Sequence, residues 1–481
     1  MISFLLSLVA LLVGYLVYGR FIESLIGPDD RPTPARRLAD GIDFVELPTW
    51  KVFMIQFLNI AGTGPIFGAI MGAKFGPSAY LWIVFGCIFA GAVHDYFSGM
   101  LSMRHDGGSM PELIGIYLGK KARNALLLFS ILVLLMVGAV FVYSPALILG
   151  SISGGDAQMM MIWVFIIFAY YIIATLLPID KIIGKIYPLF AFALLFMAAG
   201  MMIVLFVKWP SLPEVWQIGS VAPLAKEPIF PCLFITIACG ALSGFHATQS
   251  PMMARCLKSE RLGRPAFYGA MITEGVVALV WATVSSWFFY DGGYAELNST
   301  STLSAPNVVT VVSQSWLGTI GGVLAILGVV AAPITSGDTA LRSARLIVAD
   351  FLRLDQHPIR NRLLVAIPLF AVTTLLLWFN ISNQDGFNVI WGYFGWSNQT
   401  LSCFMLWTAT VYLVQHRKAY IVTLIPALFM TTTCTCFLLI SKTGFGLSPL
   451  ISYSVSAVVM LLSLCWFVSW KRKRETLNIK Q

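Results

Sequence analysis

Charged side chains are scarce in this sequence. Only 11% of its 481 residues are Asp, Glu, Lys or Arg, whereas 58% are hydrophobic and the mean hydropathy is +0.82. Soluble domains usually carry about 25% charged residues, and no soluble core of this length hides so much apolar surface. The composition therefore excludes a soluble globular protein. It predicts an integral membrane protein whose main partner is the lipid bilayer.

Motifs of other classes of membrane protein are also missing. The chain contains no His-Glu-x-x-His pair and no phosphate-binding loop, so neither a zinc protease nor an ATP-driven pump is indicated. Its eight cysteines lie mostly in apolar segments without metal-ligand spacing, and we interpret them as packing residues. We expect no cofactor, no nucleic-acid partner and no obligate protein partner. A metal-dependent intramembrane enzyme is a remote alternative, which would use His94, Asp95, His105 and His246.

Long apolar runs fill most of the chain. A membrane-spanning helix needs about 17–25 mainly apolar residues, and thirteen such runs occur with short loops between them. No loop is long enough for a soluble domain, so we predict an all-α polytopic membrane protein with a single domain, 1–481. The runs lie at 2–18, 52–71, 79–101, 125–149, 159–177, 186–207, 230–249, 267–289, 318–340, 363–379, 389–412, 419–439 and 447–469.

The basic residues support this count. With thirteen spans, 27 of the 31 Lys and Arg residues fall on one side of the membrane and four fall on the other. Because positively charged loops stay in the cytoplasm, we predict a multi-pass inner (plasma) membrane protein with its N-terminus outside and its C-terminus in the cytoplasm. The net charge of +9 then reflects topology and contact with anionic lipid, not binding to nucleic acid.

Two of the thirteen runs contain helix-breaking residues near their centres. The second run includes Gly62, Gly64 and Pro65, and the seventh includes Gly240 and Gly244. Glycine costs about 1 kcal/mol and proline about 3 kcal/mol in a helix interior. Unwound backbone in a bilayer is tolerated only where it lines a cavity or is buried in protein. The alternative is that these glycines only allow close helix packing. Packing alone, however, does not explain Pro65, which removes a backbone hydrogen bond that packed helices can keep.

The two broken spans are five positions apart. Because this offset is odd, they enter the membrane from opposite sides, and we predict that 52–207 and 230–412 are inverted repeats of five helices. Paired broken helices in inverted halves indicate a transporter whose substrate site lies between the breaks, whereas a channel needs no such pair. One extra helix, 2–18, precedes the repeats and two, within 419–469, follow them. This arrangement resembles the leucine-transporter-type fold.

Five segments of the chain resemble the carbon starvation protein A family. The resemblance covers residues from about 50 to 410. The segments read IAGTGPIFGAIMGAKFG (60–76), GAVHDYFSGMLSMRHDGGSMPELIGIYLG (91–119), ACGALSGFHATQSPMMAR (238–255), ITSGDTALRSARLIVADFL (334–352) and FGWSNQTL (394–401).

The resemblance implies a fold and a function. The family is grouped with the amino acid–polyamine–organocation transporters, which share the five-plus-five architecture. Membership implies secondary active import of short peptides across the inner membrane during carbon or nutrient starvation, driven by a proton or sodium gradient. Proton-coupled uptake of pyruvate, or of another small carboxylate or amino acid, is the alternative that it implies.

The candidate substrate-binding residues lie at the two breaks and in the eleventh span. The backbone amides of Thr63 and Gly64 open the second half of a broken helix, where a carboxylate is favoured. His246 either binds substrate or a proton, or satisfies the unwound turn. Asn398 and Gln399 offer amides to a peptide, although the neighbouring tryptophan is also typical of an interface anchor. The full set is Asn59, Gly62, Thr63, Gly64, Ser243, Gly244, His246, Gln249, Trp396, Asn398 and Gln399.

Ionisable groups inside the predicted spans are candidates for ion coupling, because burying them in a membrane is costly. We expect His94 and Asp95 toward the cytoplasmic end of the third span, where they either carry a proton or end the helix as an interfacial pair. Glu274 is either a proton carrier or the partner of a polar group in the second span. Asp338 either takes part in coupling or pairs with Arg342 one turn on.

Hydroxyl groups in the ninth span suggest sodium as the other possible coupling ion. In the leucine-transporter-type fold the corresponding helix supplies hydroxyls to a sodium site. By that resemblance Thr335 and Ser336 face the carbonyls near Ala61 and Gly62. Hard oxygen ligands suit sodium, and the sequence leaves both sodium and a proton open.

Overall fold

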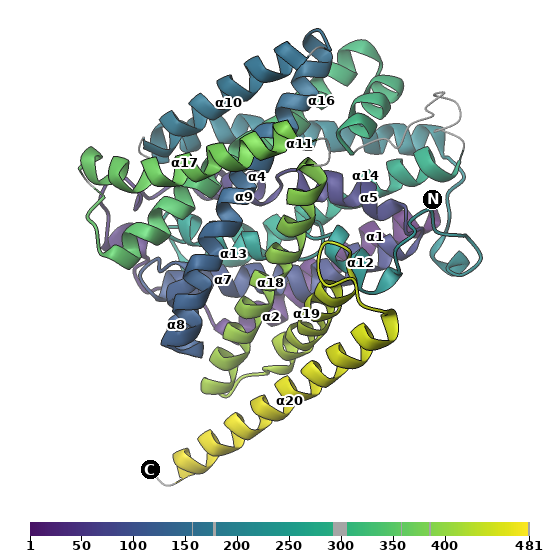
Figure 1. Cartoon of the computed structure of the whole chain (residues 1–481). Helices are drawn as coiled ribbons and strands as arrows, with labels where there is room; N and C mark the ends of the chain where they lie inside the picture. Colours follow the sequence, from purple (N-terminus) through teal and green to yellow (C-terminus); the bar gives the residue numbers. More distant parts are fainter. Residues whose placement is uncertain (156, 177–178, 292–304, 357, 384–385, 480–481) are drawn as a thin grey trace.

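The computed structural model describes residues 1–155, 157–176, 179–291, 305–356, 358–383 and 386–479. Within these ranges the chain consists of helices and connecting turns, and no β-strand occurs there. Figure 1 shows the helices packed in one bundle, with the C-terminal helix α20 (Pro449–Ile479) along its outer side. The prediction of an all-α protein is therefore confirmed.

The elements follow the order of the predicted runs, where η marks a stretch of 3₁₀ or π geometry. The first half comprises α1 (Ile2–Val13), η1 (Gly14–Tyr18), α2 (Gly19–Ile26), α3 (Pro34–Arg37), α4 (Thr49–Ile60), η2 (Gly64–Gly68), α5 (Ala69–Ala73), α6 (Ser78–Leu81), η3 (Trp82–Gly91), α7 (Ala92–Arg104), α8 (Met110–Leu118), α9 (Lys120–Ser153), α10 (Ala157–Leu176) and α11 (Ile179–Lys208). The second half comprises η4 (Val215–Gln217), α12 (Ile229–Thr236), α13 (Gly244–Ala254), η5 (Glu260–Leu262), η6 (Arg264–Gly269), α14 (Ala270–Tyr290), α16 (Ala305–Leu352), α17 (Ile359–Ser382), α18 (Gly386–Gln415), α19 (Ile421–Ile440) and α20.

Each predicted run lies on one of these helices or on two or three consecutive elements, and several helices are longer than their runs. α9 starts at Lys120 and not at 125, and α16 (Ala305–Leu352) continues past its predicted end at 340, although its backbone is non-helical at Gly318, where the predicted run begins. Backbone hydrogen bonds continue a helix past its last apolar residue, so hydropathy alone underestimates its length. In the described part of the chain, nine helices are long and apolar enough to cross a membrane, and a bent pair makes a tenth. Thirteen crossings remain a prediction.

Both predicted breaks are present. α4 ends at Ile60, helical structure resumes at Gly64, and the two axes differ by 53°. In the seventh span α12 ends at Thr236 and α13 begins only at Gly244. Pro65 lacks an amide hydrogen and so cannot extend the hydrogen-bond series of α4. The second and seventh spans are therefore each made of two half-helices.

Helix contacts repeat with an offset of five spans. In the first repeat α11 packs on α4, so spans six and two are in contact. In the second repeat α18 packs on α13, so spans eleven and seven are in contact. α7 packs on α13, joining spans three and seven, and α14 packs on α4 and α5, joining spans eight and two. α9 and α16, the fourth and ninth spans, pack extensively on each other. The two breaks are thus surrounded by matching sets of neighbours.

Candidate functional site

The two breaks lie against each other. A Cβ atom added at Gly64 would lie 2.2 Å from Sγ of Cys239, in the unwound stretch of the seventh span. A Cβ atom added at Gly68 would lie 2.8 Å from the carbonyl oxygen of Thr236, at the end of α12. These distances are too short for any side chain, so glycine is required for the backbones to approach. The structure therefore brings the predicted residues of both breaks together.

Buried polar atoms without a hydrogen-bond partner among the described residues lie at the first break and on the half-helix after the second. At the first break they are both polar side-chain atoms of Asn59 and Oγ1 of Thr63, and on α13 the atom is Oε1 of Gln249; all three residues are fully buried. One turn before Asn59, Nε2 of Gln56 donates a hydrogen bond of 3.3 Å to Oγ of Ser250, which joins α4 to α13. Because buried polar atoms are nearly always paired, these atoms mark a position suited to a polar ligand.

The second break is held by two amides of α18. Oδ1 of Asn398 accepts hydrogen bonds from the amide of Phe245 (2.6 Å) and the hydroxyl of Ser243 (3.1 Å), so it caps the start of α13. Nε2 of Gln399 donates to the carbonyl of Phe234 in α12 (3.1 Å). We expected both amides to line the substrate pathway. In the structure they satisfy backbone and side-chain groups that the break leaves without helical partners, and the pathway role stays a prediction.

Two further candidates in this region also have structural contacts. The indole N–H of Trp396 donates to the carbonyl of Cys434 in α19 (3.0 Å), so this ring faces the C-terminal helices. A Cβ atom added at Gly244 would lie 2.3 Å from both the carbonyl oxygen of Asn398 and the amide nitrogen of Ser402. Gly244 is therefore needed for contact between the backbones of α13 and α18.

Replacing Asn398 by alanine is expected to destabilise the second break. Asn398→Ala removes the acceptor for the Phe245 amide, and loss of a helix cap costs about 0.5–2 kcal/mol. We expect a lower unfolding temperature, measured by tryptophan fluorescence on purified protein in detergent. Thr400→Val is the matched control on the same helix, because its hydroxyl donates to the carbonyl of Trp396 one turn earlier. Equal unfolding temperatures for Asn398→Ala and the unsubstituted protein would contradict the capping role.

Four ionisable side chains form a buried row beside the second break, which we call the His–Asp–His–Glu row (His94, Asp95, His246, Glu274). Nδ1 of His94 and Nδ1 of His246 each lie 2.8 Å from a different carboxylate oxygen of Asp95. Nε2 of His246 lies 3.4 Å from Oε2 of Glu274. All four residues are fully buried. The row thus connects α7, α13 and α14, which belong to spans three, seven and eight.

The geometry of the row suits proton transfer. An ionised carboxylate only accepts hydrogen bonds, so Nδ1 of each histidine carries a proton when Asp95 is charged. The opposite nitrogen of His246 then faces Glu274, so this imidazole lies between two carboxyl groups. Series of Asp, Glu and His residues within membrane spans are typical of proton relays. The row can therefore hold protons and pass them between three helices.

One of the two alternatives for the His94–Asp95 pair, and one of the two for Glu274, does not fit the structure. His94 and Asp95 do not lie at the end of their helix, because α7 continues to Arg104 and both residues are fully buried. They therefore do not form an interfacial pair. The close contact of Glu274 is with His246 in the seventh span and not with a polar group in the second. A polar pair lowers the local hydropathy whether it is buried within a span or lies at the membrane interface. The sequence pattern therefore could not distinguish these two positions.

The ninth span meets the first broken helix close to the expected position. Oγ of Ser336 donates a hydrogen bond of 3.0 Å to the carbonyl of Leu58, and it would lie 3.2 Å from a Cβ atom added at Gly62. Oγ1 of Thr335 donates to two carbonyls of its own helix, at 3.0 and 2.9 Å. Only Ser336 of the two hydroxyls thus bonds to α4 among the described residues.

Asp338 lies in a separate buried cluster. It accepts a hydrogen bond from the hydroxyl of Tyr187 on α11, which also donates to the carbonyl of Thr335 (3.0 Å). Arg342 donates to the carbonyl of Ala174 and lies 3.7 Å from Oδ1 of Asp43. The sequence did not indicate Tyr187, because a tyrosine within an apolar run gives no signal of its partner. The cluster joins spans six and nine away from the His–Asp–His–Glu row.

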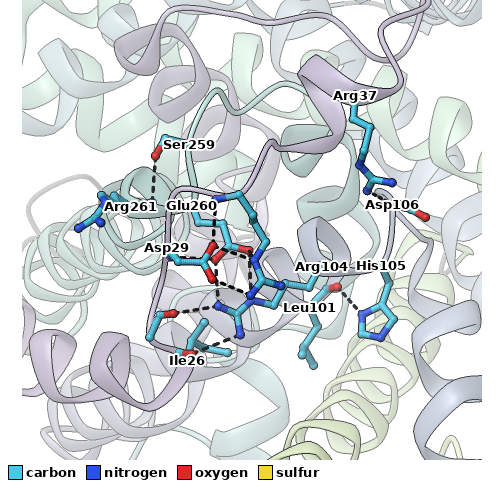
Figure 2. Close-up of polar contacts among 12 residues, drawn as sticks. Ile26, Asp29, Arg37, Leu101, Arg104, His105, Asp106, Ser259, Glu260 and Arg261 are labelled. Carbon is cyan, nitrogen blue, oxygen red and sulfur yellow. Dashed lines mark hydrogen bonds and ion pairs between the residues drawn. The ribbon is translucent and has the colours of Figure 1, made fainter.

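A second ionic group that the sequence did not indicate lies at the end of α7. Glu260 is 1% exposed and accepts hydrogen bonds from Nε and Nη2 of Arg104, at 3.1 and 2.9 Å (Figure 2). Arg104 also donates to the carbonyls of Ile26 and Gly27 and to the hydroxyl of Tyr412. Arg104 and Glu260 are 156 positions apart, so no local pattern connects them. The group ties the ends of spans one, three and eleven to the loop before span eight.

Comparison with solved structures shows the fold. A crystal structure of the manganese transporter of Eremococcus coleocola matches with a TM-score of 0.56 and 12% sequence identity. The match covers 91% of this chain and 99% of that chain. The helical architecture described above is therefore one that a known transporter adopts.

Comparison of sequences identifies relatives. An uncharacterized membrane protein of Haemophilus influenzae is 46% identical over 345 residues, which are 60% of this chain and 91% of that protein. The peptide transporter CstA of Bacillus subtilis is 26% identical, over 89% of this chain and 88% of the relative. The pyruvate/proton symporter BtsT of Escherichia coli is 29% identical, over 60% of this chain and 49% of the relative.

The family assignment rests on matches along almost the whole chain. The sequence profile described as "Carbon starvation protein CstA" matches residues 1–162, 146–316 and 310–437. These ranges include both breaks and all four members of the His–Asp–His–Glu row. This chain, a multi-pass membrane protein, belongs to the carbon starvation protein CstA family.

Proposed function

We propose that this protein is a proton-coupled secondary transporter that imports short peptides by alternating access. The observation that carries the proposal is the His–Asp–His–Glu row, which lies on the second half of a broken helix and on two of its neighbours. A proton bound there changes the charge between α7, α13 and α14. The relative stability of two packings of these helices then depends on protonation.

The helix pairings support a five-plus-five inverted repeat. Spans two and six, and spans seven and eleven, pack as equivalent pairs, as do spans three with seven and eight with two. Repeats of five helices related in this way have opposite orientations, which matches the proposed leucine-transporter-type fold with extra helices at 2–18 and 419–469. In this proposal 1–481 is one transport domain with thirteen spans.

The proposed substrate position is the first break. Thr63 and Gly64 open the half-helix that follows it, and a helix start favours a carboxylate. The unpaired atoms of Asn59, Thr63 and Gln249 add polar partners for the rest of the substrate. Because Asn398 already caps the other half-helix, we place the carboxylate at Gly64 and not at Gly244.

Short peptides are the proposed substrates, and pyruvate is the second candidate. The name peptide transporter CstA belongs to relatives that align with most of this chain, such as the one from Bacillus subtilis. The name pyruvate/proton symporter belongs to BtsT, which aligns over a smaller part. Both substrates carry a carboxylate, and both fit the same half-helix. Uptake during carbon starvation remains part of the proposal.

A proton is the proposed coupling ion. Of the two hydroxyls proposed for sodium, only Ser336 bonds to the first broken helix among the described residues, whereas Thr335 bonds within its own helix. The His–Asp–His–Glu row, by contrast, contains two imidazoles. We further propose the inner membrane as the location, with the N-terminus outside, because 27 of 31 basic residues then face the cytoplasm.

Purified protein in liposomes containing a pH-sensitive dye tests the proposal. We expect added di- or tripeptides to acidify the interior without sodium, and free amino acids to have no effect. Acidification by pyruvate alone would contradict peptide transport and support the second candidate. Uptake of labelled peptide that requires sodium would contradict proton coupling and return attention to Ser336.

A further inference from the structure

A cavity of about 920 Å³ lies among the segments assigned to the cytoplasm by their charge. Small-molecule sites typically enclose about 300–1,000 Å³. We call this cavity the vestibule. Its walls come from the segment before α4, the chain between α7 and α9, and the ends of α13 and α16, which contribute Phe44, His105, Arg255 and Asp350 among others.

A much smaller cavity of about 10 Å³ lies next to the vestibule, on the side of the second break. Its lining includes Thr248 and Ser343, and Arg255 lines both cavities. Thr248 directly precedes Gln249, one of the residues with an unpaired polar atom. The side chain of Arg255 therefore lies between the two cavities.

Arg255 is held in place by three different neighbours. Its Nε donates a hydrogen bond of 2.9 Å to the carbonyl of Gly107, and its Nη2 lies 3.2 Å from Oδ2 of Asp350. The guanidinium also lies 5.0 Å from the ring centre of Phe44. The Arg255 side chain is 7% exposed, whereas that of Asp350 is 28% exposed. Of the two ion-pair partners, Asp350 is thus the one that can move into the vestibule.

We propose that the vestibule is a second substrate station, with Arg255 as its carboxylate-binding residue and as the gate to the cytoplasm. The substrate carboxylate replaces Asp350 on Arg255, and this exchange opens a path between the two cavities. The inference rests on the proposed function, because both candidate substrates carry a carboxylate. Arginine binds carboxylates in a two-point geometry. Exchange of one carboxylate for another avoids an unpaired buried charge, which is strongly destabilising.

Cysteine accessibility tests the gate without any substrate. Thr248→Cys is made in a Cys465→Ser background, because Cys465 is exposed and the other seven cysteines are buried. Inside-out vesicles are treated with a membrane-impermeant maleimide. We expect Arg255→Gln or Asp350→Asn to raise the labelling rate about tenfold, as loss of a charge-assisted hydrogen bond permits. Labelling in right-side-out vesicles should not change.

The matched control is another arginine–aspartate pair on the cytoplasmic side. Arg261 lies 2.8 Å from Oδ1 of Asp30, and both side chains are more than 60% exposed. The hydrogen bond from Arg261 lowers the pKa of Asp30, so this pair is charged at neutral pH. Arg261→Gln should leave labelling of Cys at position 248 unchanged. An unchanged rate in both Arg255→Gln and Asp350→Asn, or an equal rise in Arg261→Gln, would overturn the gate.

Transport from the cytoplasmic face tests carboxylate binding. For inside-out vesicles and dialanine we expect Arg255→Gln to raise the half-saturating concentration about tenfold, with Arg255→Lys in between. Half-saturation from the opposite face should stay the same, and dialanine amide should not distinguish the variants. An equal change at both faces, or an equal effect on the amide, would overturn the carboxylate role. If no peptide is transported at all, the proposed function fails, whereas the labelling result still decides the gate.

Discussion

Replacing Asp95 by asparagine is expected to abolish substrate-driven proton uptake. Asp95 accepts one hydrogen bond from His94 and one from His246. Each of these bonds is charge-assisted when its histidine is protonated. An amide has one acceptor and one donor group, so it satisfies only one of the two Nδ1–H donors. Each lost bond to a charged group is worth about 1.5–3 kcal/mol. We expect acidification of dye-loaded liposomes to slow about a hundredfold or more.

A second readout separates coupling from folding in the Asp95→Asn variant. Exchange of labelled for unlabelled substrate across the liposome membrane needs no net proton movement, and we expect it to persist. The matched control is Asp30→Asn, which changes an exposed carboxylate paired with Arg261, and it should acidify the lumen at the normal rate. Normal acidification by Asp95→Asn would exclude the His–Asp–His–Glu row as the proton path.

Replacing Gly244 by alanine is expected to abolish transport with the protein still inserted in the membrane. The new Cβ atom would lie 2.3 Å from two backbone atoms of α18, the carbonyl oxygen of Asn398 and the amide nitrogen of Ser402. Backbone atoms cannot move aside as a flexible side chain can, so α13 must shift away from α18. Overpacking of this kind costs about 1–3 kcal/mol. Because α13 also carries His246, the shift disrupts the substrate position and the row together.

The same helix offers a control for this substitution. Gly392 lies in α18, and an added Cβ atom there meets nothing closer than 3.9 Å. Gly392→Ala should therefore transport at the normal rate, and it should reach the membrane in the same amount as Gly244→Ala. Gly64→Leu should fail in the same way as Gly244→Ala, because its Cβ position is 2.2 Å from Sγ of Cys239. Normal uptake by the Gly64 and Gly244 variants would contradict a site at the broken helices.

The helices and their breaks could be predicted because both depend on local chemistry. An apolar run of sufficient length forms a helix in lipid, where each backbone polar group must be satisfied within the segment. Gly64 and Pro65 interrupt such a helix wherever it packs, since proline lacks an amide hydrogen. Helix ends were less accurate, as the turns of α16 after residue 340 show, because a helix does not stop where its apolar residues do.

The roles of single polar residues could not be predicted in this way. Asn398 reads like a pathway residue, but its partner is the Phe245 amide, 153 positions away. Asp95 reads like an interfacial residue, but it lies between His94 and His246, which is 151 positions away. Such pairs depend on which helices pack together and on how the helices are shifted along their axes relative to each other. Neither the packing partners nor this shift can be read from hydropathy or local spacing.

The sequence by itself thus determined the class of the protein, the approximate position of its apolar helices and the two places where helices break. These follow from the cost of burying charge and of interrupting a backbone hydrogen-bond series. Only the tertiary structure decided that Asp95, His246 and Glu274 form one row, and that Asn398 closes the second break. Only the packing of α7 and α14 against α13, and of α18 against the same half-helix, brings those side chains within hydrogen-bonding distance.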